Sequence, residues 1–163
     1  MFAPKPMKFI DSNTRLKYSF IDNYESAFKA SFPAMTLNSP QNIKPGKILI
    51  VEDETDISFA LQMILETSGY IVKTAENGKV ALDLIKKEGP FQLILLDMQM
   101  PVMNGWTFAE NFYTQYGHST PIIVMTAAAN SQQRAEEIKA NDWIDKPFEM
   151  AKLQSKVKSY LGP

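Results

Sequence analysis

One stretch of the chain, residues 91–105, constrains the fold more than any other. It begins with an unbroken apolar run over residues 93–96 and then stops on the carboxylate of Asp97. A strand that is apolar on both faces belongs inside a parallel sheet with helices on both sides. Open sheets of this kind place their functional sites at the carboxyl ends of the strands, so Asp97 is a candidate site residue. Asn104 and the glycine after it predict a turn, followed by a helix from Trp106.

From residue 47 onward, short apolar strands alternate with amphipathic helices. Strands are expected over residues 48–51, 70–75, 93–97, 121–126 and 143–146, and helices over residues 55–68, 78–88, 106–116, 131–139 and 149–161. Repeated strand–helix–strand units give a parallel sheet with right-handed crossovers and helices on both faces. The pattern therefore predicts an α/β domain with five strands and five helices.

The first part of the chain, residues 1–45, has a different composition. Prolines recur through it, at Pro4, Pro6, Pro33, Pro40 and Pro45, and leave room for little regular structure. One short helix is expected over residues 22–31, where Asp22 and Glu25 have the spacing of a capping box. We therefore expect an N-terminal extension over residues 1–45 and one domain over residues 46–163.

Composition excludes several classes of protein. The formal net charge is -1, which provides no general attraction to nucleic acid or to anionic membranes. The chain has no cysteine and a single histidine, His118, so disulfides are excluded and a zinc site is improbable. Neither a secretion signal nor an apolar run long enough to span a membrane is visible. We therefore expect a cytoplasmic protein that binds neither membranes nor nucleic acid directly.

Polar side chains end most of the predicted strands. Glu52 and Asp53 follow the first strand, Asp97 ends the third, Thr126 ends the fourth and Lys146 follows the fifth. In a parallel sheet these residues meet at one edge, where three carboxylates would repel one another unless a cation neutralised them. Carboxylate oxygens with room for waters suit Mg²⁺. Asp97 could then attack phosphorus to form an acyl phosphate, while Thr126 and Lys146 contact the phosphoryl oxygens.

Four motifs in this order resemble the receiver domain of bacterial two-component response regulators. They cover residues 48–54, 93–105, 122–127 and 143–148, and the resemblance extends over about residues 47–161. It implies a flavodoxin-like, doubly wound parallel sheet with strand order 2-1-3-4-5.

The resemblance also implies a function and a set of site residues. It implies transfer of a phosphoryl group from a sensor histidine kinase or a histidine phosphotransfer protein to Asp97, with Thr126 and Lys146 contacting that group. Trp143 takes the place of the switch aromatic. The groups implied as Mg²⁺ ligands are the side chains of Glu52, Asp53 and Asp97 and the backbone carbonyl of Gln99.

As a whole, the chain is expected to be a single-domain response regulator. It would signal through the surface of its fourth helix, fifth strand and fifth helix, either by protein contact, which includes a phosphorylation-dependent homodimer, or by phosphorelay. Any enzymatic activity would be limited to Mg²⁺-dependent phosphorylation and dephosphorylation of its own aspartate. The alternative is a degenerate receiver that binds proteins independently of phosphorylation.

Three departures from the family pattern fall on that output surface. Trp143 is larger than the usual Tyr or Phe, and Lys139 with Ala140 stands where Gly-Ala is usual. The fourth helix must therefore end without the expected glycine. The stretch between Thr126 and Lys146 is also slightly shorter than is common.

Other functions fit the residues less well. The acidic residues 52–54 would repel the phosphate of a flavin nucleotide, and Gln99 stands where an aspartyl-phosphate phosphatase needs a second aspartate. The scattered cations of residues 1–45 form no helix-turn-helix pattern. The glycine–lysine motif of phosphate-binding loops is absent from the sequence.

Overall fold

The computed structural model describes residues 45–127 and 130–162. The helix predicted at residues 22–31 and nearly all of the predicted N-terminal extension lie outside these ranges. Strands and helices alternate through the described part of the chain. They are β1 (Lys47–Val51), α2 (Thr55–Thr67), β2 (Ile71–Ala75), α3 (Gly78–Glu88), β3 (Leu93–Asp97), α4 (Gly105–Tyr116), β4 (Ile122–Thr126), α5 (Ser131–Glu137), β5 (Asp142–Asp145) and α6 (Met150–Leu161).

The five strands form one parallel sheet in the order β2-β1-β3-β4-β5, which confirms the predicted topology. The central strand β3 is buried along its whole length, as its continuous apolar sequence predicts. In its pairing with β4, Asp97 lies opposite Met125, and in the next pair Thr126 lies opposite Asp145. The register therefore brings the polar ends of these strands to the same edge of the sheet.

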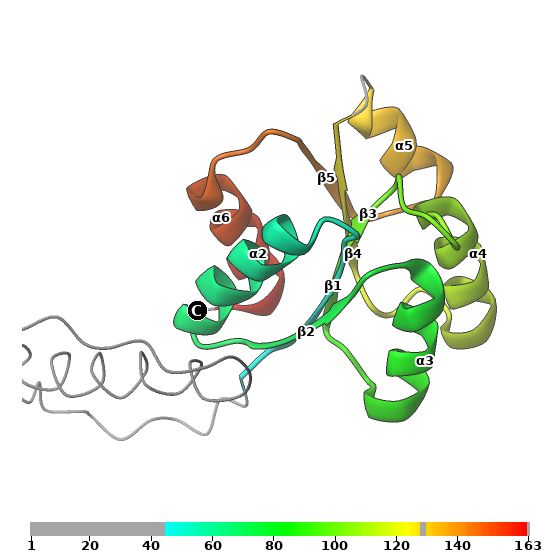
Figure 1. The fold of residues 1–163 in the computed structure, drawn as a ribbon, viewed down its shortest axis with the longest axis horizontal. Helices are drawn as coiled ribbons and strands as arrows, with labels where there is room; N and C mark the ends of the chain where they lie inside the picture. Colours follow the sequence, from blue (N-terminus) through cyan, green and yellow to red (C-terminus); the bar gives the residue numbers. More distant parts are fainter. Residues whose placement is uncertain (1–44, 128–129, 163) are drawn as a thin grey trace, which may run out of the picture. The chain divides into compact units, whose positions relative to one another are not determined.

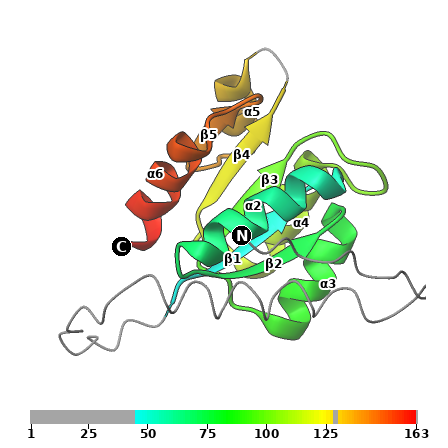
Figure 2. The same ribbon diagram turned by 60° about the vertical axis from the view of Figure 1, so that its left-hand side comes forward.

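Helices cover both faces of the sheet, which gives the described domain three layers. In Figure 1, α2 and α6 lie on one side of the sheet and α3, α4 and α5 on the other. Figure 2 shows the domain turned so that α2 and α6 lie toward the viewer. Each face has its own apolar cluster, because alternate strand residues point to opposite sides. None of the described helices is long and apolar enough to cross a membrane.

Asparagine side chains begin two of the helices, as the sequence indicates. Asn77 Oδ1 accepts a hydrogen bond from the backbone N–H of Val80 at 3.0 Å and caps α3. Asn104 Oδ1 accepts one from the backbone N–H of Thr107 at 3.0 Å and caps α4, which begins one residue before the predicted start. Each cap satisfies a backbone donor that the helix itself leaves unpaired.

Helix α5 is shorter than predicted. The sequence pattern indicates a helix to residue 139, but α5 ends at Glu137. The backbone N–H of Ala140 donates to the carbonyl of Ala135 at 2.8 Å, and Lys139 adopts a left-handed conformation with φ of 54°. Such a turn usually uses glycine, so the predicted ending without glycine is confirmed, with a lysine in the unfavourable conformation.

Candidate functional site

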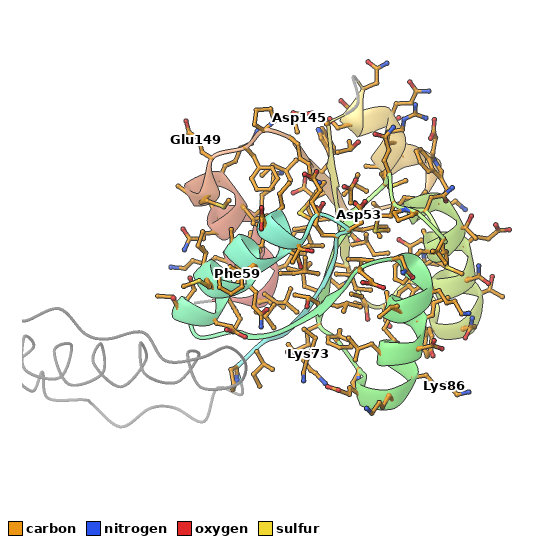
Figure 3. All side chains as sticks on the ribbon, viewed as in Figure 1. Asp53, Phe59, Lys73, Lys86, Asp145 and Glu149 are labelled. Carbon is orange, nitrogen blue, oxygen red and sulfur yellow. The ribbon has the colours of Figure 1, made fainter. Side chains whose placement is uncertain are left out.

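The site lies at the carboxyl edge of the sheet. Glu52 follows β1, and its backbone N–H donates to the carbonyl of Ala75 at 2.9 Å. Lys146 follows β5, and its backbone N–H donates to the carbonyl of Thr126 at 2.8 Å. These bonds continue the strand pairing past the last strand residues and fix the chain where the functional side chains leave it. In Figure 3, the labelled side chains of Asp53 and Asp145 mark this edge.

The ammonium group of Lys146 lies between two carboxylates. Its Nζ donates to Glu52 Oε2 at 2.6 Å and to Asp97 Oδ2 at 2.7 Å. All three side chains are largely withdrawn from solvent, with exposed fractions of 11% for Lys146, 9% for Asp97 and 0% for Glu52. The sequence predicts that these residues share one edge, and the structure brings them into direct contact.

For both Glu52 and Lys146, burial and the neighbouring charges shift the pKa in opposite directions. Burial raises the pKa of Glu52 to about 7, against the lowering effect of the nearby Lys146 ammonium. For Lys146, burial alone would lower the pKa, but the bonds to Asp97 and Glu52 outweigh burial and raise it above its usual range. Lys146 therefore stays charged, while Glu52 is held in its ionised form only weakly.

The acidic side chains are close enough to share one cation. Glu52, Asp53 and Asp97 each offer a carboxylate oxygen, and the three oxygens lie within 4.8 Å of one another. Oxygens bound to an octahedral Mg²⁺ lie about 3–4 Å apart, so a small contraction would bring these three onto one ion. Glu52 Oε1 is buried and has no hydrogen-bond partner among the described residues. The donor set and this unsatisfied oxygen both fit a hard divalent cation.

The segment after Asp97 folds back on the strand end. The backbone N–H of Gln99 donates to Asp97 Oδ1 at 3.0 Å, which orients the carboxylate. The backbone N–H of Gly105 donates to the carbonyl of Met98 at 3.1 Å. A Cβ atom at position 105 would lie 2.7 Å from the backbone oxygen of Asp97, so only glycine fits there without displacing the strand end. The backbone amide of Gln99 thus lies at the site, while metal ligation by its carbonyl stays a prediction.

The two predicted switch residues occupy different environments. Thr126 is buried at the end of β4. Trp143 lies opposite Val124 in the sheet register and packs, half-buried, against the apolar cluster on the α3–α4–α5 side. Lys156 Nζ lies 6.0 Å from the centroid of the Trp143 ring. Trp143 therefore reaches the boundary between the core and the surface at edge strand β5, where a switch residue is expected.

An open hollow of about 380 Å³ adjoins the acidic side chains. Glu52 and Asp53 line one end of it, and residues of α2, β2 and α3 line the rest. Phe59, labelled on α2 in Figure 3, is 61% exposed beside this hollow, and Val80 of α3 is also exposed. Sequence reasoning assigns no role to these two apolar residues. Their position on the outward side of otherwise amphipathic helices is the signal that could have identified them.

Two further contacts near the site were not expected from the sequence. Lys146 is predicted to contact a phosphoryl group, and its pairing with Glu52 adds a role in balancing buried charge. Ser131 at the start of α5 donates a hydrogen bond to Asp145 at the end of β5. Neither contact has a periodic sequence signal, because both join side chains from separate elements.

Sequence comparison identifies the family. The family model described as the response regulator receiver domain matches residues 48–158. Among curated relatives, the uncharacterised transcriptional regulatory protein YkoG of Bacillus subtilis is 36% identical over 121 residues, which cover 73% of this chain and 52% of that protein. The probable transcriptional regulator ycf27 of Porphyra purpurea is 37% identical over 117 residues, 71% of this chain and 47% of that protein. The chain thus aligns with about half the length of these relatives.

Solved structures agree with the sequence comparison. The chemotaxis protein CheY4 of Vibrio cholerae matches with a TM-score of 0.67 and 30% identity, over 72% of this chain and 100% of that chain. The response regulator TrrA of Thermotoga maritima, solved in complex with Mg²⁺–BeF, matches with a TM-score of 0.64 and 32% identity, over 71% of this chain and 99% of that chain. The sheet order, the edge site and these matches together show that the chain belongs to the response regulator receiver-domain family.

Proposed function

We propose that this receiver domain accepts a phosphoryl group on Asp97 in a Mg²⁺-dependent reaction. The observation that carries the proposal is the position of Lys146, whose ammonium contacts both Asp97 and Glu52. A carboxylate at the end of a buried strand, beside a fixed cation and two further acidic groups, suits a reaction that transfers a highly charged group. The donor would be a phosphohistidine of a sensor histidine kinase or a histidine phosphotransfer protein.

The residues of this chain have distinct roles in the proposed transfer. A carboxylate oxygen of Asp97 forms the new bond to phosphorus while the bond between phosphorus and the donor's imidazole nitrogen breaks, and its electron pair stays on that nitrogen. Lys146 and the hydroxyl of Thr126 then contact the phosphoryl oxygens. Glu52, Asp53, Asp97 and the backbone carbonyl of Gln99 would hold Mg²⁺, which neutralises charge on the transferring group when bound.

Exposed apolar side chains beside the site support a protein as the phosphoryl donor. Phe59 and Val80 flank the hollow that begins at Glu52 and Asp53. A folded donor that rests on these side chains could present its histidine to Asp97, whereas a small-molecule donor would need no such surface. The proposal therefore assigns the α2 side of the site to the donor.

Output is proposed to leave through the opposite side of the site. Thr126 would move toward a phosphorylated Asp97, and Trp143 would shift with it on the surface formed by α5, β5 and α6. Because an indole is larger than the usual aromatic side chain here, we expect a shift in conformational populations rather than a complete reversal. The surface would then bind a protein partner, which includes a second copy of this chain.

Intact-mass measurement after incubation with acetyl phosphate tests the proposed chemistry. The unaltered protein should gain one phosphoryl group in the presence of Mg²⁺ and none when the metal is chelated. Asp97→Asn should gain none, because an amide oxygen is a poor nucleophile. Asp83→Asn, which alters an exposed aspartate of α3, is the matched control and should react like the unaltered protein.

Phosphorylation of Asp97→Asn at the rate of the control would refute the assignment of Asp97. An unaltered protein that gains no phosphoryl group, from acetyl phosphate or from a histidine kinase, would instead favour the alternative of a phosphorylation-independent binding module.

A further inference from the structure

Helix α5 depends on contacts with other elements. It has only seven residues, from Ser131 to Glu137, and an isolated helix of this length is unstable in water. Its N-cap residue, Asn130, makes no capping hydrogen bond through its side chain. The helix buries only Ser131 and Ala135 along its length. Its position must therefore be set by side chains from elsewhere in the fold.

Trp106, in the first turn of α4, provides such a contact. Its indole N–H donates to Glu137 Oε2 at 2.9 Å, across the space between α4 and the last residue of α5. The guanidinium carbon of Arg134 lies 5.1 Å from the centroid of the Trp106 ring, and Arg134 Nη1 lies 3.2 Å from the same Glu137 oxygen. The three side chains thus form a closed triangle, in which Arg134 both covers the indole ring and orients the carboxylate that binds it.

The charge on Glu137 fits this arrangement. The hydrogen bond from Trp106, and then the contacts with Arg134, hold the pKa of Glu137 below its usual range. The carboxylate therefore remains ionised at neutral pH and accepts a charge-assisted bond. Glu136 and Glu137 each accept a hydrogen bond from a glutamine of the same helix, but among the described residues only Glu137 also accepts one from α4.

Trp106 is also fixed with respect to Asp97. Gly105 precedes it, and the close packing of Gly105 against the backbone oxygen of Asp97 leaves no space for even a methyl group. The backbone N–H of Gly105 also donates to the carbonyl of Met98. A displacement of the Asp97 segment would consequently move the start of α4. Trp106 would carry that displacement to α5 by a route that involves neither Thr126 nor Trp143.

We propose that Trp106, Arg134 and Glu137 form a latch that holds α5 to the start of α4 in the unphosphorylated protein and opens when Asp97 is phosphorylated. The observed contacts of Trp106, Arg134 and Glu137 are enough to support the restraint on α5. The link between this restraint and phosphorylation rests on the function proposed above. The latch adds a second connection between the site and the output surface, beside the one through Thr126 and Trp143.

Hydrogen exchange measured by mass spectrometry on the unphosphorylated protein tests the restraint. Trp106→Phe keeps an aromatic ring but removes the indole N–H, and Glu137→Gln replaces the charged acceptor of that N–H with a neutral amide. Trp106→Phe should speed exchange of the α5 amides by roughly two- to fivefold, and Glu137→Gln by less, because the interaction lies at the surface and the amide oxygen can still accept. Glu136→Gln is the matched control and should leave α5 exchange unchanged.

The double variant Trp106→Phe/Glu137→Gln should exchange no faster than Trp106→Phe, because Trp106→Phe already removes the hydrogen bond that Glu137→Gln weakens. Amides of α2 provide an internal reference for global destabilisation. Unchanged α5 exchange in both single variants, equal acceleration in Glu136→Gln, or acceleration spread equally over α2 would each overturn the latch.

A second arm adds Mg²⁺ and beryllofluoride, an analogue of the phosphoryl group. In the unaltered protein this addition should speed α5 exchange. In Trp106→Phe it should produce a smaller fold-change, because the restraint is already gone. An equal fold-change in the unaltered protein and in Trp106→Phe would show that the contact between Trp106 and Glu137 does not respond to phosphorylation, and would overturn the proposal. Failure of the unaltered protein to bind beryllofluoride would refute the proposed function, and the first arm would still decide whether the latch exists.

Discussion

Two neighbouring regions on the same side of the sheet, the segment from Asp97 to the start of α4 and the helix α5, are held in place by different means. The first contains its own anchors: Asp97 ends a fully buried strand, Asn104 caps α4, and Gly105 packs against the strand end. Helix α5 has no side-chain N-cap, and the turn after it places Lys139 in a left-handed conformation. The proposed chemistry thus rests on a segment that its own contacts anchor, and the proposed output on an element with few anchoring contacts within its own residues.

The largest effect is expected from removing the cation that lies between the buried carboxylates. Lys146→Met leaves Glu52 and Asp97 without their shared partner and should lower the free energy of unfolding, measured with urea and no metal, by about 3 kcal/mol. Mg²⁺ should restore part of this loss, since it replaces the missing positive charge.

Lys156→Met is the matched control on the output side. Lys156 pairs with Asp142 at 2.6 Å, but both side chains are more exposed than those at the site. Its loss should cost at most about 1 kcal/mol. Equal losses in the two variants would mean that the site is no more rigidly organised than the output surface.

A smaller effect is expected at the cap of α4. Asn104→Ala removes the acceptor for the backbone N–H of Thr107 and should cost about 1 kcal/mol in urea unfolding. Glu149 is the N-cap residue of α6 and makes no side-chain capping bond, so Glu149→Ala should change stability by less than about 0.5 kcal/mol. If Asn104→Ala lowered the free energy of unfolding no more than Glu149→Ala, the Asn104 cap would not be an anchor for the start of α4.

The smallest effect has the opposite sign and concerns the end of α5. Lys139 has a φ of 54°, a conformation that is unfavourable for a residue with a Cβ atom but not for glycine. Lys139→Gly should therefore stabilise the protein by about 0.5 kcal/mol in thermal or urea unfolding. Lys152→Gly, the same change within α6, should destabilise it by about 1 kcal/mol. Destabilisation by both changes would show that the Lys139 conformation carries no strain.

The same contrast decides what the sequence could predict. The strands around Asp97 were predictable because each is a short apolar run that ends on a polar residue, and a parallel sheet brings such ends together. The meeting of these polar ends at one edge follows from that pattern, and the sheet order followed from the family resemblance.

Contacts between side chains of separate elements could not be predicted in this way. The pairing of Lys146 with Glu52 joins residues far apart in the sequence, and the bond from Trp106 to Glu137 joins two helices whose relative placement no periodic pattern encodes. The end of α5 was predicted two residues too late because Ile138 and Lys139 continue a helical pattern, whereas the tertiary turn to β5 requires a left-handed residue.

In the mechanism proposed here, phosphorylation of Asp97 changes the conformation of α5 and β5 and leaves α2, on the donor side, unchanged. Hydrogen exchange of the unaltered protein, with and without Mg²⁺ and beryllofluoride, tests it most directly, with Asp97→Asn as the control that should not respond. Beryllofluoride should alter exchange in residues 130–145 and leave exchange in α2 unchanged. Changes confined to α2 or to residues 1–44, with residues 130–145 unaffected, would contradict it.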